Sequence, residues 1–194
     1  MIKENLSHNR EFVANKKYEK YITDKYPNKK IAIVACMDTR LIELIPAALG
    51  LKNGNMQIVK NAGGLITQPF DSTIRSLLVA IYELGVKYIF IIGHTDCGAQ
   101  HINGDDMIAR MKQHGISEDH IEMMRYCGID FDSWLNGFDD GAAAISETVD
   151  LVRNHPLVPK DIYVYGFLMD SVTGALRMIE DGGERDNYEL KIKN

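Results

Sequence analysis

Four short runs of consecutive apolar residues recur along the chain. They are rich in β-branched and aromatic side chains and span residues 31–36, 56–59, 88–92 and 162–167. Apolar runs of this length are typical of strands that are covered on both faces of a sheet. We therefore predict that these four segments form a central β-sheet.

Helical patterns lie between the predicted strands, at residues 41–50, 71–85 and 140–154. The first two end in a glycine, which favours the end of a helix, and Asp71 or Ser72 can cap the start of the second. Strands that alternate with helices form right-handed βαβ units and a parallel sheet. We therefore predict an α/β fold with a mostly parallel central sheet and flanking helices.

The remaining segments lie outside this alternation. Residues 1–26 are polar with apolar positions at helical spacing, so we expect a helical arm that ends before Pro27. Residues 104–138 are polar and rich in methionine, and we expect an insertion of one or two short helices. Residues 184–194 form a charged tail. No linker or repeat divides the chain, so we predict a single domain over residues 1–194.

Composition and charge narrow the range of functions. With 45% hydrophobic and 25% charged residues, the chain is close to an average globular protein, which excludes disordered and fibrous classes. Its net charge of −5 favours neither nucleic acid nor an anionic membrane as a partner. No apolar run approaches the ~18 residues of a membrane span, and the N-terminus lacks an apolar signal core. We therefore expect a cytoplasmic protein without a nucleic-acid or membrane partner.

Three residues at predicted strand ends form a candidate metal site. Cys36 ends the first strand, and His94 and Cys97 follow the third. Ligands of open parallel sheets bind at the carboxyl ends of the strands, so these side chains can meet at one edge. Taken singly, such a cysteine or histidine is more often a structural residue. Together, two thiolates and an imidazole suit zinc, and three protein ligands leave a fourth position for water, as in catalytic sites.

Asp38 and Arg40 stand beside this candidate site. A bound zinc ion lowers the pKa of its water to about 7, so that hydroxide is available at neutral pH. Asp38 can act as a fourth ligand and close the site, or Arg40 can hold Asp38 in a charge-assisted pair and leave the position open for water. Arg40 is thus a candidate gate, and in the open state Asp38 can accept a hydrogen bond from the hydroxide.

Two glycines follow the second predicted strand. Gly63 and Gly64, in the sequence NAGG at 61–64, offer backbone amides that suit an anion-binding nest for substrate. Tight packing around the metal site explains them equally well. The chain has no phosphate-loop or dinucleotide-binding motif, which argues against a nucleotide-binding domain.

Four other residues of potentially reactive type carry weaker signals. Cys127 lies in the insertion, far from any partner motif, and we expect it to be structural. We expect His101 and His114 to lie on the surface. Asp96 is expected to be a solvated loop carboxylate, with a contact to His94 as the alternative.

Three motifs of this sequence resemble those of β-class carbonic anhydrases. The family pattern is Cys-x-Asp-Ser/Thr-Arg, then Asn-Ala-Gly, then Gly-His-x-x-Cys-Gly. The chain reads CMDTR at 36–40, NAGG at 61–64 and GHTDCGA at 93–99. The resemblance covers most of residues 30–177 and is strongest to the compact bacterial and archaeal members.

This resemblance implies a site, a reaction and an assembly. Cys36, His94 and Cys97 would hold one zinc ion per chain, and Asp38 and Arg40 would form a catalytic dyad. The reaction would be the reversible hydration of a small-molecule substrate, carbon dioxide, to bicarbonate and a proton. The family assembles as dimers or tetramers, which implies a homodimer or homotetramer with the N-terminal helix packed on a neighbouring subunit.

Two alternative functions use the same candidate site. Carbonyl sulfide or carbon disulfide can be the substrate, since a zinc hydroxide attacks their carbon atoms equally well. The chain can also be a non-catalytic, regulatory zinc-binding protein in which Asp38 permanently closes the site. Arg40 argues against the regulatory alternative, because a closed site has no use for a gate.

Overall fold

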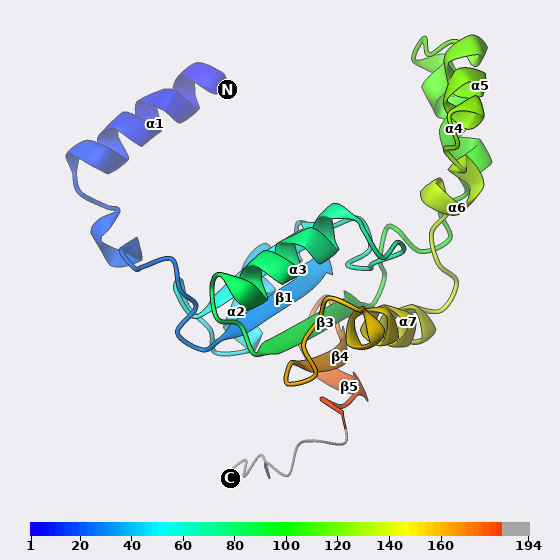
Figure 1. Cartoon of the computed structure of the whole chain (residues 1–194). Coiled ribbons are helices and arrows are strands. Elements are labelled where there is room, and N and C mark those ends of the chain that lie inside the picture. The colour runs from blue at the N-terminus through cyan, green and yellow to red at the C-terminus, as the bar shows by residue number, and fades with distance from the viewer. Residues whose placement is uncertain (184–194) are drawn as a thin grey trace.

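A five-stranded sheet forms the centre of the protein (Figure 1). The structure is a computed structural model that describes residues 1–183, so the predicted tail at 184–194 lies outside the described residues. The strands are β1 (Ile31–Cys36), β2 (Met56–Asn61), β3 (Tyr88–His94), β4 (Tyr163–Met169) and β5 (Leu176–Glu180). They lie in the order β2-β1-β3-β4-β5; the first four are parallel and β5 is antiparallel to β4. The predicted α/β fold with a mostly parallel sheet is confirmed.

The sheet brings the carboxyl ends of β1, β2 and β3 to one edge. Cys36 of β1 pairs with Asn61 of β2, and Ala35 pairs with Ile92 of β3. Both β2 and β3 continue beyond their apolar runs, to Asn61 and His94. Residues that carry candidate chemistry are therefore fixed by the hydrogen bonds of the sheet as well as by loops.

Helices cover both faces of the sheet. α3 (Ser72–Tyr82) and α7 (Gly141–Asn154) pack on one face, where Ile91 is fully buried. α2 (Leu41–Ala48) packs on the other face, in a second cluster that contains Ile33. The strongly apolar runs of β1 and β3 are explained by this cover on both sides.

Side-chain caps mark where two of these helices begin. Asp71 accepts a hydrogen bond from the backbone N of Ile74 at 2.8 Å. Asp140 accepts one from the backbone N of Ala142 at 2.7 Å. Each cap satisfies an amide of the first helical turn that has no partner within the helix. Of the two predicted caps for α3, the structure shows Asp71.

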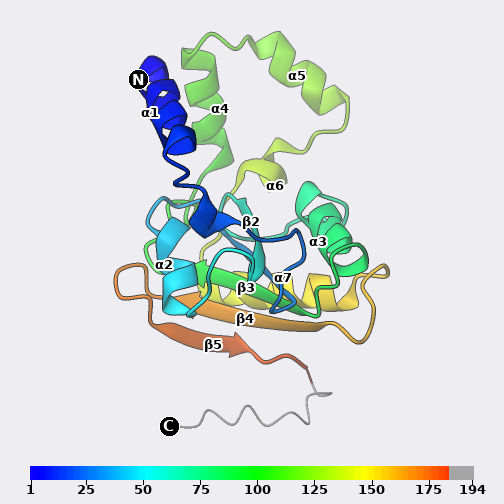
Figure 2. The same cartoon turned by 90° about the vertical axis from the view of Figure 1, so that its left-hand side faces the viewer.

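The N-terminal arm projects from this body (Figures 1 and 2). It consists of α1 (Ile2–Ala14), which contains no buried residue, and a 3-10 helix at Glu19–Tyr21. Lys16 lies between them with a φ of +53°, a left-handed conformation that interrupts the helix. The prediction of one helix that continues to Pro27 is therefore wrong, although the arm is helical.

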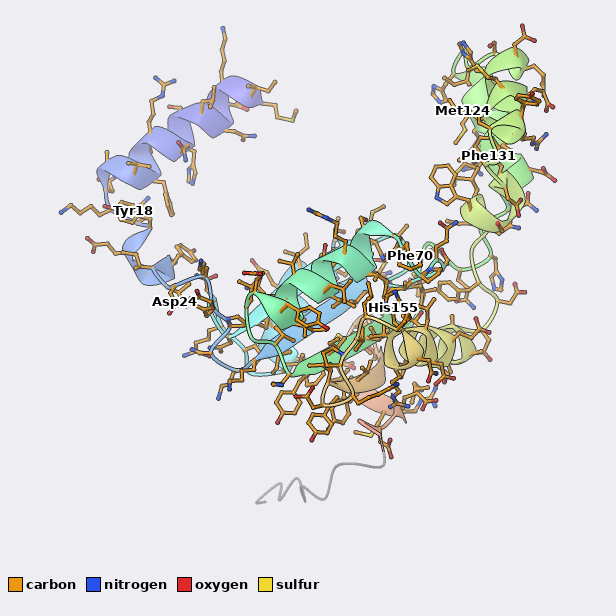
Figure 3. All side chains as sticks on the ribbon, in the orientation of Figure 1. Tyr18, Asp24, Phe70, Met124, Phe131 and His155 are labelled. Carbon is orange, nitrogen blue, oxygen red and sulfur yellow. The ribbon has the colours of Figure 1, made fainter. Side chains whose placement is uncertain are left out.

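A second projecting segment is the insertion between β3 and α7. It contains α4 (Gly104–Gln113), α5 (Glu118–Tyr126) and α6 (Phe131–Leu135), so the prediction of one or two helices is corrected to three. It has a small core of its own, formed by Ile108, Ile121 and Phe131. Figure 3 shows Phe131 on this segment, well away from the sheet. Among residues 1–183, no helix combines the length and apolar character needed to span a membrane.

Candidate metal centre

Cys36, His94 and Cys97 come together at the carboxyl edge of the sheet. One potential ligand atom of each residue lies within 4.8 Å of the others, and the two Sγ atoms are 3.8 Å apart. All three residues are buried. β1 and β3 are neighbours, so the ends of these strands place Cys36 and His94 side by side. The structure thus unites the three predicted ligands in one group.

His94 presents a ring nitrogen without a partner to this group. Its Nδ1 lies 2.9 Å from the backbone oxygen of Thr95 and therefore carries the proton and donates it. Nε2 is buried and has no hydrogen-bond partner among the described residues. Burial lowers the pKa of His94, which keeps the ring neutral. A buried lone pair of this kind is costly unless something binds it, so the ring fits a metal ligand.

The two thiols complete a set of ligands that suits zinc. Burial, together with the neighbouring Cys36, raises the pKa of the Cys97 thiol to about 11. A bound divalent cation reverses this preference and deprotonates a coordinating thiol. Two thiolates and a neutral imidazole are ligands that zinc prefers, and they fill three of its four tetrahedral positions.

Arg40 holds the carboxylate of Asp38 next to this group. Oδ1 of Asp38 accepts hydrogen bonds from the backbone N and from Nε of Arg40 at 2.9 and 3.0 Å, and Oδ2 accepts one from Nη2 at 2.8 Å. These hydrogen bonds hold the pKa of Asp38 well below its usual range and raise that of Arg40. Oδ2 also lies 4.0 Å from Nε2 of His94. Of the two predicted arrangements of Asp38, the structure shows the one in which Arg40 holds it.

Asp96 also contacts Arg40, which sequence analysis missed. Its side chain is 85% exposed, as expected for a loop carboxylate, but Oδ2 accepts a hydrogen bond from Nη1 of Arg40 at 2.8 Å. The backbone oxygen of Asp96 accepts a second one from Nη2 at 2.8 Å. The expected alternative, a contact with His94, is therefore replaced by a contact with the candidate gate. No motif in the sequence joins residues 40 and 96.

Lys60 is a second residue that sequence analysis missed. Its Nζ donates a hydrogen bond to the backbone oxygen of Cys36 at 3.0 Å. Burial lowers the pKa of Lys60. The predicted strand ends at residue 59, whereas in the structure β2 continues through Lys60, which pairs with Ala35 near the end of β1.

The two candidate glycines differ in their roles. Gly64 has a φ of +70°, and a Cβ atom built on it would lie 2.6 Å from the backbone N of Cys36. Tight packing beneath the metal centre therefore requires glycine there. Gly63 has a φ of +84°, and a Cβ atom on it would meet Ala99 at an ordinary 3.4 Å. Its backbone conformation, and not its surroundings, is what favours glycine at this position.

A cleft opens onto Cys36 of the cluster and onto the dyad. Its volume is about 500 Å³. Small and apolar residues form much of its wall, together with Cys36, Asp38 and Arg40; they include Met37, Ala62, Gly63, Ala99 and Ile102. Such a cleft admits a small, neutral, weakly polar molecule to the metal position and offers few groups that would bind a large polar one.

The other candidate residues lie away from the cluster. His101 and His114 are exposed, as predicted, and Nδ1 of His101 lies 3.1 Å from Oδ1 of Asp139. Cys127 is exposed at the end of α5. The expectation of a structural cysteine is therefore wrong, because this side chain packs into no core.

Comparisons with known proteins agree on one family. The family model described as carbonic anhydrase matches residues 31–176. A Bacillus subtilis protein named "Putative carbonic anhydrase YtiB" is 46% identical over 177 residues, which are 91% of this chain and 95% of that protein. The matched residues 31–176 include the whole cluster and the dyad.

Two other relatives extend the comparison to a solved structure and to another reaction. The crystal structure of β-carbonic anhydrase isoform I of Trichomonas vaginalis has a TM-score of 0.86 and 37% identity, and the match covers 94% of this chain and 99% of that one. A carbon disulfide hydrolase of Acidithiobacillus thiooxidans is 33% identical over 159 residues, 77% of each chain. Over most of its length the chain is thus similar to proteins named for two different reactions.

Proposed function

The chain belongs to the β-carbonic anhydrase family, and we propose that it catalyses the reversible hydration of carbon dioxide to bicarbonate and a proton. One observation carries this proposal: a buried, unpartnered imidazole nitrogen lies beside two thiols, next to a carboxylate that Arg40 holds. This arrangement can bind a metal ion while leaving one position to solvent.

We assign one zinc ion per chain to Cys36, His94 and Cys97. When bound, the ion supplies Lewis acidity, lowering the pKa of a water molecule to about 7 so that a nucleophile is available at neutral pH. Thr95 fixes the orientation of the His94 ring through its backbone oxygen. An oriented ring presents its Nε2 lone pair toward the position at which it would hold the ion.

Asp38 and Arg40 act on the nucleophile in this proposal. Arg40 keeps Asp38 charged and donates side-chain hydrogen bonds to both of its carboxylate oxygens. The carboxylate therefore remains close to the cluster without acting as a fourth ligand. There Asp38 accepts a hydrogen bond from the nucleophile and orients its lone pair. The cleft wall at Gly63 and its apolar neighbours holds carbon dioxide, which is small and neutral and needs little specific recognition.

Replacing one zinc ligand tests the proposal directly. Cys36→Ser is expected to lose both zinc content and carbon dioxide hydration, measured by atomic absorption and stopped-flow assay. Cys127→Ser is the matched control, since Cys127 is exposed and outside the cluster, and it should retain both. Full zinc content and full hydration in Cys36→Ser would contradict the assignment.

Hydrolysis of carbon disulfide or carbonyl sulfide is a second candidate function. The carbon disulfide hydrolase relative supports it, because that protein matches most of this chain. Parallel assays of hydration and of sulfide release on the same preparation distinguish the two. A regulatory, permanently closed zinc site is less well supported, since Asp38 is engaged by Arg40 in the structure.

We further propose a homodimer or homotetramer of single-domain chains in the cytoplasm. Support for assembly comes from α1, which buries no residue in the isolated chain and exposes Leu6 and Val13. Support for a reducing compartment comes from the unpaired Cys36 and Cys97, which must stay reduced to bind a metal. Light scattering coupled to gel filtration measures the assembly.

A further inference from the structure

We propose that Asp96 is a positioning residue that holds Arg40 in the orientation from which Arg40 keeps Asp38 off the metal position. This inference rests on the proposed function, because a gate matters only where a metal ion has an open position. It adds a third residue to the dyad, from a different loop. Asp38 and Arg40 follow β1, whereas Asp96 lies between His94 and Cys97 after β3.

The contacts of Arg40 carry the argument. A guanidinium group has five N–H donors in a rigid plane. Nε and Nη2 donate to the two carboxylate oxygens of Asp38 at 3.0 and 2.8 Å. Nη1 and Nη2 donate to the side chain and the backbone oxygen of Asp96, both at 2.8 Å. Arg40 is therefore bound on both edges of its fork, by Asp38 on one and by Asp96 on the other.

The backbone of Asp96 favours this contact. Its φ is +53°, in the left-handed region that aspartate, asparagine and glycine adopt more readily than other residues. In this conformation Asp96 offers both its carboxylate and its carbonyl to the same side chain. Because Asp96 lies between the candidate ligands His94 and Cys97 in the sequence, the position of this loop is tied to both of them.

Holding Arg40 in advance makes its pairing with Asp38 less costly. A free arginine side chain loses rotamer freedom each time it pairs with a carboxylate. When Asp96 already fixes the guanidinium, less freedom remains to be lost on pairing with Asp38. The Asp96 side chain is 85% exposed, so water screens this contact. Exposed ion pairs of this kind change an equilibrium by about two- to fivefold, which is the effect expected here.

Two variants of Asp96 and one control separate the effect of the side-chain hydrogen bond to Arg40 from the effect of the negative charge. Asp96→Gly keeps the left-handed backbone and the carbonyl acceptor but removes the carboxylate. Asp96→Asn keeps a side-chain acceptor and removes only the charge. Asp161→Asn is the matched control, because Asp161 is also an exposed aspartate in an ion pair, with Lys87, at the opposite edge of the sheet. Circular dichroism of each variant verifies that it is folded.

The first readout needs neither metal nor activity. In metal-free protein labelled with ¹⁵N, relaxation of the Arg40 Nε–H group reports how rigidly the guanidinium is held. We expect the order parameter of the Arg40 Nε–H bond to fall clearly in Asp96→Gly, to fall less in Asp96→Asn, and to stay unchanged in Asp161→Asn. An equally ordered Arg40 in Asp96→Gly would overturn the proposal.

The second readout follows the open position in the cobalt(II)-loaded protein. Azide binds an open metal position and changes the visible spectrum of cobalt, so its apparent dissociation constant reports the open fraction. We expect azide to bind about two- to fivefold more weakly to Asp96→Gly than to wild type, with Asp161→Asn unchanged. Unchanged or tighter azide binding would overturn the proposal; tighter binding would mean that Asp96 draws Arg40 away from Asp38.

The wild-type protein distinguishes this proposal from the proposed function. If wild type binds no zinc and hydrates no carbon dioxide, the proposed function fails, while the relaxation of Arg40 still tests its contact with Asp96. If wild type is active and binds zinc but Asp96→Gly matches it in both readouts, only the role of Asp96 fails.

Discussion

Substituting alanine for Gly64 is expected to destabilise the protein directly beneath the metal centre. Gly64 has a φ of +70°, and a Cβ atom on it would lie 2.6 Å from the backbone N of Cys36 and 2.8 Å from the backbone C of Ala35. A left-handed backbone costs alanine about 1–2 kcal/mol. Forcing extra volume into a packed site costs about 1–3 kcal/mol more. The free energy of unfolding should therefore fall by about 2–5 kcal/mol.

Gly85→Ala is the matched control for this substitution. Gly85 has a φ of +72°, but nothing lies within 4 Å of the position that its Cβ atom would take. It should therefore lose only the backbone cost of about 1–2 kcal/mol. Urea unfolding of both variants and wild type measures the difference, and the zinc content of folded Gly64→Ala reports whether Cys36 has moved. Equal stability of the two variants would refute the reasoning, since contact with β1 would then cost nothing.

Two other predictions concern the dyad. Arg40→Ala should keep its zinc, but the equilibrium should shift by about tenfold or more toward the state in which Asp38 binds the metal, because hydrogen bonds to charged groups contribute about 1.5–3 kcal/mol each. X-ray absorption at the zinc edge measures the added oxygen ligand. Unchanged coordination would count against the gate. The lowered pKa of Asp38 contributes stability that is present above the ordinary aspartate value of 3.8 and is lost as pH falls below it. Asp38→Asn should therefore lose less stability than wild type between about pH 5 and about pH 3 in urea unfolding, and equal losses would show that the pair contributes nothing in solution.

The strands and the metal cluster were predictable because they depend on simple regularities. Apolar runs predicted four of the five strands, and parallel strands bring their carboxyl ends to one edge whatever the details of the loops. Cys36 and His94 end neighbouring strands, so the two residues lie close together once β1 and β3 are adjacent in the sheet. Cys97 follows so closely that one turn brings it back to the same point.

Other features depended on conformations that no pattern of residue types reveals. The contact of Asp96 with Arg40 requires a left-handed residue in the loop after β3, and aspartate adopts that conformation without being restricted to it. The N-terminal arm is interrupted at Lys16, which also has a positive φ. Because this residue is not a glycine, the sequence gives no signal for the interruption. Lys60 was missed because a single charged residue ended the apolar run, whereas the backbone of β2 continues through it.

The exposed N-terminal helix ties the secondary structure of this protein to its concentration. α1 has 13 residues and buries none of them, and isolated helices shorter than about 12–15 residues are only marginally stable in water. In the proposed oligomer, a neighbouring subunit supplies the free energy that keeps this helix folded. Dilution below the protein concentration at which the subunits separate should unwind this segment. The magnitude of the mean residue ellipticity at 222 nm, which is otherwise independent of concentration, should then decrease on dilution.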